Sequence, residues 1–487
     1  MSNSDHNINR FNRLQPLDRV ALGTILVILV LVSILLLVGD RTSVRVADFS
    51  WQNKQVGVGD RSFALTFNAP INPASVEKEA LSIKPGLDGK VSLVGRRMFY
   101  NLTEIPAYET KYTVVLKSAK DELEPFSSNF ITRDRYLAYI GVKGEEKGRL
   151  LLYNWAEKSK VILTPPALVV TDFVAYREGD KLLFSAWRIG SKTQKFSQQK
   201  LYTVTTGLNF ASTTQAKPSG RLELILDAKD YQNLQFSLSP AEEKIIVQRV
   251  SRTNPGEFGL WSISSDQEAE SLGIKGGEFQ ITPQGDTIAV AQTQGIKTFP
   301  LIPEASTEVL FSNYGRILDF SRQGSKVMVK FNPDATQSLF LVEQTGQGEG
   351  EAKEVLKTQG SIFSCQFEPR QEEALYCLIT QRTEETTSEQ STLTLINLKT
   401  FQATPLIALP NQQAVKMNIA PDGSNLVFEQ LLAPIPGSST LLQGNDGQGI
   451  SSGKIWLLNL PNIPSPDNLA AEKPQQLVPG FKPTWLP

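Results

Sequence analysis

Apolar and turn-forming positions alternate in a hairpin pattern that recurs seven times between Ala175 and Trp485. Each copy has an apolar strand, a turn in the place of Pro-Asp-Gly, and a second apolar strand. The clearest copies read LSPAEEKIIV (238–247), ITPQGDTIAV (281–290), FSRQGSKVMV (320–329) and IAPDGSNLVF (419–428). Two weaker copies begin at Ala175 and Phe367, and the seventh ends as PTWLP at Pro487. A repeat of this length predicts a ring or a stack of similar units.

The spacing and the strand pattern favour a β-propeller over residues 134–487. Successive copies begin 39 to 66 residues apart, and a four-stranded blade takes about 40–45 residues before insertions. The second strand of each hairpin is apolar on both faces, as strands packed between neighbouring blades must be. Residues 136–164 supply three strands without a first one, so we predict that residues 480–487 complete this blade and close the ring. Seven blades follow, or six if one weak hairpin is irregular.

Short alternating strands between residues 46 and 133 predict a separate β-sandwich. They read SFALTF (62–67), GKVSLV (89–94), RMFYNL (97–102), KYTVVL (111–116) and SNFIT (128–132). The stretch FNAPINPASV (67–76) resembles Ig-like domains of bacterial surface proteins of the S-layer type. The hairpin repeat, ending in Pro-Thr-Trp at residues 483–485, resembles TolB-like propellers with WD-like repeats. The first resemblance implies a module that spaces or presents other domains and has no catalytic residues, and the two together imply a bacterial cell-envelope protein with a binding propeller.

An N-terminal apolar run predicts a membrane anchor. Residues 20–38 are nineteen residues without a charge, which is long enough for a transmembrane helix over 20–39. A cleaved signal peptide is the alternative, although its apolar region is usually about 7–15 residues long. Basic residues flank both ends almost equally. The short polar tail, residues 1–19, favours a disordered cytoplasmic N-terminus, with both soluble domains outside the cytoplasm of a single-pass plasma-membrane protein.

Charge and residue counts narrow the possible chemistry. The net charge of the chain is -1 and the sequence has no basic stripe that could neutralise phosphates, which argues against nucleic acid as a partner. His6 is the only histidine, so no imidazole base is available in the folded part. We expect no cofactor and no metal site. The predicted turn places Cys365 opposite Tyr376, which argues against a disulfide to Cys377 unless the register slips around residues 369–373.

Two charged loops are the candidate partner-binding sites. One is basic, with Arg188, Lys192 and Lys195, and the other is acidic, with Glu384 and Glu385. Both also fit solvated insertions between strands. Loops are nevertheless where binding residues concentrate on propellers and sandwiches.

These observations predict a non-enzymatic, membrane-tethered binding or scaffold protein. Its propeller would bind a protein, a peptide or an envelope polymer, and another envelope or membrane protein is the expected partner. The segment 449–453 fits G-x-S-x-G, but it lacks the strand-to-helix turn and the histidine of a serine hydrolase. Two alternatives remain open: a propeller glycoside hydrolase that uses paired carboxylates, and an accessory subunit of a membrane or envelope complex.

Overall fold

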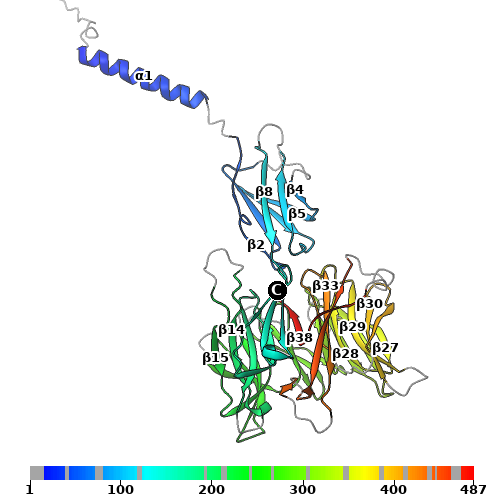
Figure 1. Cartoon of the computed structure of the whole chain (residues 1–487). Helices are drawn as coiled ribbons and strands as arrows, with labels where there is room; N and C mark the ends of the chain where they lie inside the picture. Colours follow the sequence, from blue (N-terminus) through cyan, green and yellow to red (C-terminus); the bar gives the residue numbers. More distant parts are fainter. Residues whose placement is uncertain are drawn as a thin grey trace, which may run out of the picture.

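The computed structural model describes most of the chain, and the ranges are 16–38, 43–71, 81–117, 123–190, 195–209, 217–240, 244–264, 268–302, 308–343, 350–382, 389–409, 415–435, 441–444, 447–461 and 473–487. The apolar run near the N-terminus forms helix α1 (Pro16–Val38) (Figure 1). Over these described residues, no helix combines the length and the hydropathy that a membrane crossing requires. The expected transmembrane helix is therefore not supported by the structure.

The described residues between 46 and 132 form two four-stranded sheets that enclose one core (Figure 1). Every second side chain of a strand points to the same face of its sheet, which explains this core. Phe63, Leu65 and Phe67 of one strand are accordingly all buried. Val114 and Leu116 do the same from the opposite sheet. The assignment to the Ig-like class stays a prediction. In sheet order the strands are β1 (Val46–Phe49), β3 (Ser62–Phe67), β6 (Arg97–Leu102) and β5 (Gly89–Val94), then β2 (Gln55–Val56), β8 (Phe126–Thr132), β7 (Lys111–Leu116) and β4 (Leu81–Lys84).

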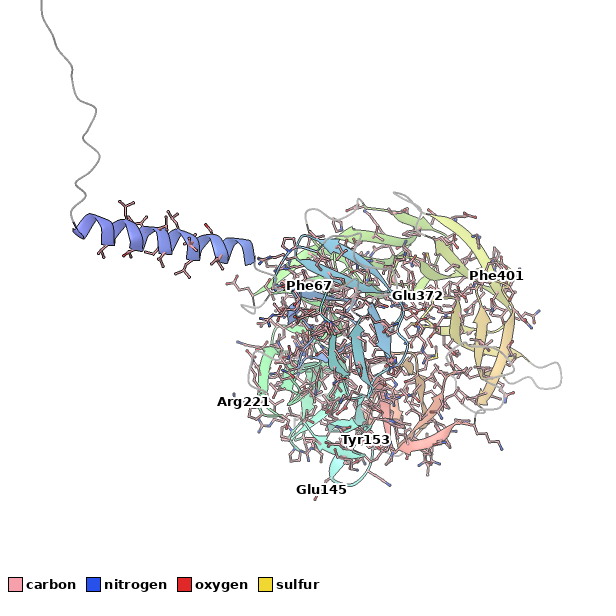
Figure 2. All side chains as sticks on the ribbon, turned by 90° about the horizontal axis from the view of Figure 1, so that it is seen from above. Phe67, Glu145, Tyr153, Arg221, Glu372 and Phe401 are labelled. Atoms are coloured by element: carbon pink, nitrogen blue, oxygen red, sulfur yellow. A yellow bond between two sulfur atoms is a disulfide. The ribbon has the colours of Figure 1, made fainter. Side chains whose placement is uncertain are left out.

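The rest of the described chain forms seven four-stranded sheets arranged in a ring (Figure 2). We call them blades one to seven. Blades one to three are β38 (Gly480–Trp485), β9 (Tyr136–Gly141), β10 (Leu150–Asn154), β11 (Ser159–Ile162); β12 (Leu168–Ala175), β13 (Lys181–Arg188), β14 (Lys200–Thr205), β15 (Leu222–Leu226); and β16 (Tyr231–Leu238), β17 (Ile245–Ser251), β18 (Phe258–Ile263), β19 (Ala269–Lys275).

The remaining blades have the same order of strands. They are β20 (Phe279–Ile281), β21 (Thr287–Gln292), β22 (Gly295–Pro300), β23 (Leu310–Ser312); β24 (Arg316–Phe320), β25 (Lys326–Phe331), β26 (Gln337–Glu343), β27 (Glu351–Thr358); β28 (Ile362–Phe367), β29 (Ala374–Arg382), β30 (Glu389–Asn397), β31 (Ala403–Leu409); and β32 (Met417–Ile419), β33 (Asn425–Leu432), β36 (Ser452–Asn459), β37 (Gln475–Val478). Blade seven carries an inserted hairpin, β34 (Leu442–Gln443) and β35 (Gly449–Ile450).

Burial falls from the middle of each blade to its outer edge. The second strand β13 is almost entirely buried, whereas the fourth strand β15 is mostly exposed. Apolar runs on second strands thus pack against both neighbouring blades, and the polar outer strands face solvent. The large core clusters accordingly join residues of adjacent blades rather than residues of one sheet.

The C-terminal strand completes blade one. β38 pairs antiparallel with β9, so Gly480 lies opposite Gly141 and Trp485 lies opposite Leu137. Phe481 and Trp485 of β38 are buried, at 3% and 4% exposure. The two ends of the propeller segment therefore share a sheet, and β9 has no unpaired inner edge.

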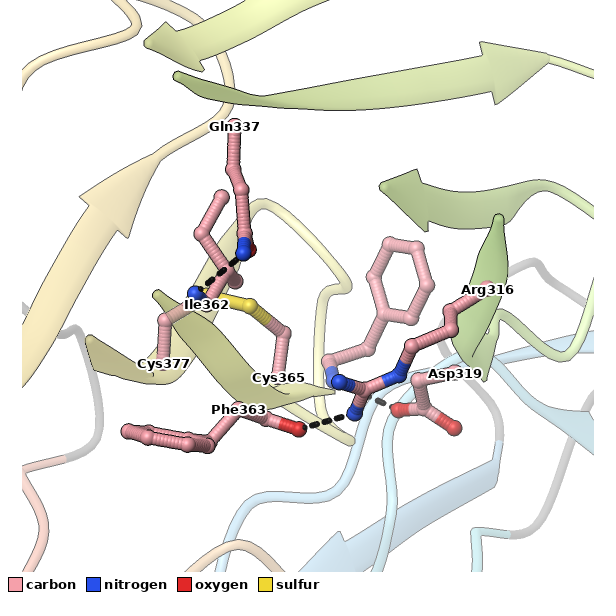
Figure 3. The surroundings of a disulfide bond; sticks show 8 residues. Arg316, Asp319, Gln337, Ile362, Phe363, Cys365 and Cys377 are labelled. Atoms are coloured by element: carbon pink, nitrogen blue, oxygen red, sulfur yellow. Dashed lines mark hydrogen bonds between the residues drawn. A yellow bond between two sulfur atoms is a disulfide. The ribbon is translucent and has the colours of Figure 1, made fainter. Parts of the chain in front are cut away.

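The expectation of unpaired cysteines was wrong. Cys365 and Cys377 form a disulfide with a Cα–Cα distance of 4.0 Å, and the two residues lie directly opposite each other (Figure 3). The turn of blade six is the cause. Phe367 pairs with Leu375, whereas the corresponding Ile419 of blade seven pairs with Leu426. One extra residue in the turn shifts the register by one position, which brings the two thiols together.

Candidate functional site

Side-chain amides on the first strands of the blades join neighbouring blades. Gln280 donates from Nε2 to Ile317 O at 2.9 Å, which links β20 to β24. Gln366 accepts a bond at Oε1 from Ile419 N at 3.1 Å, which links β28 to β32. The corresponding bonds elsewhere are Gln235 Nε2 to Phe279 O at 3.1 Å and Trp485 N to Asn418 Oδ1 at 2.7 Å. These polar groups are therefore used to hold the ring together.

Asp319 is a half-buried carboxylate on β24, the first strand of blade five. It accepts hydrogen bonds from Phe320 N at 2.9 Å and from Phe367 N at 2.8 Å, and the second bond joins blade five to blade six. Burial raises the pKa of Asp319 to about 7, although both N–H groups favour the ionised form. Arg316 lies beside it and donates from Nη2 to Phe363 O at 2.7 Å (Figure 3). The carboxyl thus serves as an inter-blade acceptor.

Lys482 ties the closing strand to both neighbouring blades. Its Nζ forms an ion pair with Asp172 of β12, in blade two. Its backbone N donates to Glu429 Oε2 of blade seven at 2.6 Å, and Glu429 Oε1 accepts from Lys416 N at 3.1 Å. Each of these carboxylates is paired with a cation or with backbone donors, as buried charges must be. Within the described ranges, no group of three or more His, Cys, Asp or Glu is placed to hold a metal ion.

One end of the ring is joined to the sandwich. We call it the turn face, because the first and second strands of blades two to seven are connected there. Tyr108 N of the sandwich donates to Asp422 Oδ2 in the Pro-Asp-Gly turn of blade seven at 3.2 Å. Arg135 pairs with Glu109 at 2.8 Å and donates from Nη1 to Ser424 Oγ at 2.8 Å. Asp422 is 3% exposed, so water competes little for this contact.

Arg133 adds contacts to two further blades. Its guanidinium donates to Pro487 O beside blade one at 3.4 Å and pairs with Glu178 in the turn of blade two at 3.5 Å. A Cβ at Gly57 of the sandwich would lie 2.8 Å from this guanidinium, so the glycine leaves room for it. The sandwich is therefore fixed to blades seven, one and two together (Figure 1).

The hairpin turns of blades three to seven are also linked to one another. Each turn in this series donates to the turn of the next blade. The bonds are Ser239 Oγ to Gly285 O at 2.8 Å, Gln284 Nε2 to Arg322 O at 3.2 Å, Arg322 Nε to Glu372 Oε1 at 3.0 Å, and Arg370 Nε to Asp422 O at 2.9 Å. The repeated turns therefore form a belt that ends at the turn holding the sandwich.

The opposite end of the ring, where second and third strands are connected, is the loop face. Arg188 lies there, exposed at the end of β13. Lys195 begins the short helix η3 (Lys195–Gln198), whose first side chains are not described. Lys192, Glu384 and Glu385 lie outside the described residues. The structure thus places one predicted residue with its side chain, and no contact between the two predicted loops is described.

Sequence reasoning missed the apolar part of the loop face. Ile189, Leu432 and Ile435 are 48%, 54% and 79% exposed. The sequence feature that could have indicated it is Leu-Leu-Ala-Pro-Ile (431–435), a mostly apolar segment at the start of a loop that is otherwise rich in Gly, Ser and Pro. Ser451 of the G-x-S-x-G segment donates from its hydroxyl to Leu432 O at 2.9 Å. In this structure the serine holds the loop.

Comparisons with known proteins give only remote similarities. No family model matches the chain, and no curated protein matches it. Among solved structures, TolB from Acinetobacter baumannii is 11% identical with a TM-score of 0.37, over 71% of this chain and 86% of that one. An oligogalacturonate lyase from Vibrio parahaemolyticus is 12% identical at 0.39, over 70% and 84%. A prolyl endopeptidase is 9% identical at 0.45, over 77% and 49%. At these scores the similarities carry no argument about activity.

Proposed function

We propose that this protein is a non-enzymatic binding or scaffold protein, in which the sandwich holds the propeller so that its loop face is presented to a partner. One observation carries the proposal. The sandwich is bonded to blades seven, one and two at the turn face through Asp422, Arg135 and Arg133. This arrangement leaves the loop face on the other side of the ring.

The chemistry of the ring supports binding over catalysis. Asp172, Asp319 and Glu429, the carboxylates described above on the inner part of the ring, are engaged by backbone N–H groups or by Lys482. A glycosidase needs one carboxyl that can donate a proton and a second that faces the sugar. Asp319 can hold a proton up to about pH 7, but both of its oxygens already accept backbone N–H groups, as the oxygens of Glu429 do, and these contacts hold the fold together.

Chemical crosslinking and pull-down of the tagged full chain from native membranes tests the proposal. We expect one protein to be enriched in this pull-down relative to a control pull-down with a tagged membrane protein of unrelated fold. Failure to enrich any protein, or turnover of glycosides by the purified chain, would contradict it. Activity assays on Asp172→Asn and Glu429→Gln variants would then show whether those carboxylates perform the reaction.

We also propose that residues 20–38 attach the chain to a membrane and that the sandwich and propeller lie outside the cytoplasm. Two observations support this proposal. Large aliphatic side chains along α1 are exposed, for example Val20 at 69% and Leu26 at 64%. Both cysteines of the chain are joined in a disulfide, a bond that persists mainly in oxidising compartments. Release of the protein from membranes by alkaline carbonate would contradict the membrane attachment. Protection of the propeller from added protease in sealed spheroplasts would contradict its location outside the cytoplasm.

A further inference from the structure

The inserted hairpin of blade seven builds a firm surface on the loop face. Leu442 and Ile450 are buried, at 0% and 4% exposure, in the same core cluster as Val169 of blade two. A Cβ at Gly148 of blade one would lie 3.4 Å from Leu442 Cδ2 and 3.1 Å from Val169 Cγ1. Described parts of the loops of blades seven and one and the start of blade two therefore pack on one another.

Exposed apolar side chains lie on this surface. Ile189 follows the last residue of β13, and Leu432 is the last residue of β33, so the two lie where the second-to-third-strand connections of blades two and seven begin. Ser451 N and the Ser451 hydroxyl both bond to Leu432 O, which holds the start of the connection that bears Ile435. Single exposed apolar residues are common on proteins, but several on adjoining packed loops mark an interaction site.

Exposed cations accompany these apolar residues. Lys143 and Lys147 flank η2 (Gly144–Glu146) in the loop of blade one, and Arg188 precedes Ile189. Over the ranges that the structure covers, none of these three cations forms an ion pair, whereas the neighbouring Glu146 pairs with Lys160. The sequence from 188 to 200 contains four basic residues and no acidic one, in a chain whose net charge is -1. The stretch from 188 to 200 is thus a local concentration of positive charge, whereas the loop of blade one also carries the exposed Glu145 between its two lysines.

We propose that an acidic, partly apolar segment of a partner protein binds this surface, which we call the basic platform: Lys143, Lys147, Arg188, Ile189, Leu432 and Ile435. The inference rests on the proposed binding function and names the site and the partner's chemistry. Charge complementarity indicates the partner's chemistry. Cations without an ion-pair partner would attract carboxylates of the partner at the rim, and apolar side chains of the partner would cover the apolar side chains of the platform. Nucleic acid fits less well, since this chain lacks a continuous basic stripe and the centre of the platform is aliphatic.

Site-specific photo-crosslinking in the full chain tests the site. A photoreactive amino acid replaces Ile189 or Ile435 on the platform, and, as matched controls, Phe331 (51% exposed) or Phe401 (37% exposed) on blades five and six. Irradiation of native membranes should give one crosslinked protein from the platform positions, attached through a segment rich in Asp and Glu. Crosslinks from only the control positions would overturn the platform while keeping the binding function. No crosslink at any of the four would overturn both.

Charge reversal tests the chemistry. The crosslinked segment is made as a synthetic peptide, and its Kd is measured for the full chain and for the Lys147→Glu/Arg188→Glu double variant. We expect the Kd to rise about tenfold, and the difference to shrink at high salt. Lys90→Glu, an exposed lysine on the sandwich, should leave the Kd unchanged. An equal effect of both variants, or sedimentation with anionic phosphatidylglycerol vesicles that needs the same two cations, would refute a protein partner at this site.

Discussion

Removal of the closing strand should prevent the ring from forming a stable structure. Phe481, Trp485 and Leu486 are each at most 4% exposed, in cores shared by blades seven, one and two. Truncation of a buried aromatic side chain costs about 3–5 kcal/mol and that of a buried leucine about 2–5 kcal/mol. Loss of all three therefore removes roughly 8–15 kcal/mol, which equals the total stability of a typical domain, about 5–15 kcal/mol.

The assay compares thermal unfolding and native-state hydrogen exchange of the full chain with those of a chain lacking residues 480–487. We expect loss of the cooperative transition of the propeller and fast exchange of the amides of β9, which would lose its inner partner. Trp485→Ala gives the graded test, with about 3–5 kcal/mol expected. Phe401→Ala, at a 37% exposed position, should change stability by less than about 1 kcal/mol. A truncated chain that unfolded at the same temperature as the full one would refute the closure.

Three further predictions concern the disulfide, the half-buried Asp319 and the contact between the sandwich and the propeller. Replacing Cys365 and Cys377 together with alanine should lower stability by about 3 kcal/mol, the loop-entropy value for a separation of 12 residues, and the urea midpoint of the variant should match that of the reduced wild type. Because burial raises the pKa of Asp319 to about 7, the folded state holds this proton between pH 4 and 7 while the unfolded state releases it. Stability should therefore fall with rising pH across that window, by at most about 1.4 kcal/mol per unit, and Asp319→Asn should remove this slope in urea titrations. Asp422→Ala should loosen the sandwich, because only the contacts of Arg135 and Arg133 described above then remain, and a spin-label distance distribution between sandwich and propeller should broaden; Asp334→Ala, in the connection between β25 and β26 of blade five, should leave the distribution narrow.

The repeated strands could be read from sequence because their burial is periodic. In the sandwich, the expected bounds of four strands agree with β3, β5, β6 and β7. In the ring, residues 480–487 were expected to complete the blade that lacked a first strand, and β38 does pair with β9. Both inferences depend on hydrophobic patterns that a strand must satisfy wherever it packs.

Features that depend on a single residue or on tertiary contacts could not be predicted in the same way. One additional residue between Phe367 and Leu375 moved Cys365 opposite Cys377, and a hydrophobic pattern does not specify turn length to that accuracy. The bond between Tyr108 and Asp422 joins residues more than three hundred positions apart, so no local signal marks it. The exposure of Ile435 likewise follows from how its loop packs, which sequence alone leaves open.

The pairing of β38 with β9 also sets an order of events during synthesis. The ribosome makes β9 first among the strands of the ring and β38 last. Until β38 emerges, blade one has an open inner edge and cannot bond to both neighbours through Lys482. Blades two to seven can assemble their sheets while this edge stays available to wrong partners. Synthesis of β38 thus converts an open arc with an unpaired strand edge into a closed ring, so that a defect in this one strand affects the packing of its neighbouring blades.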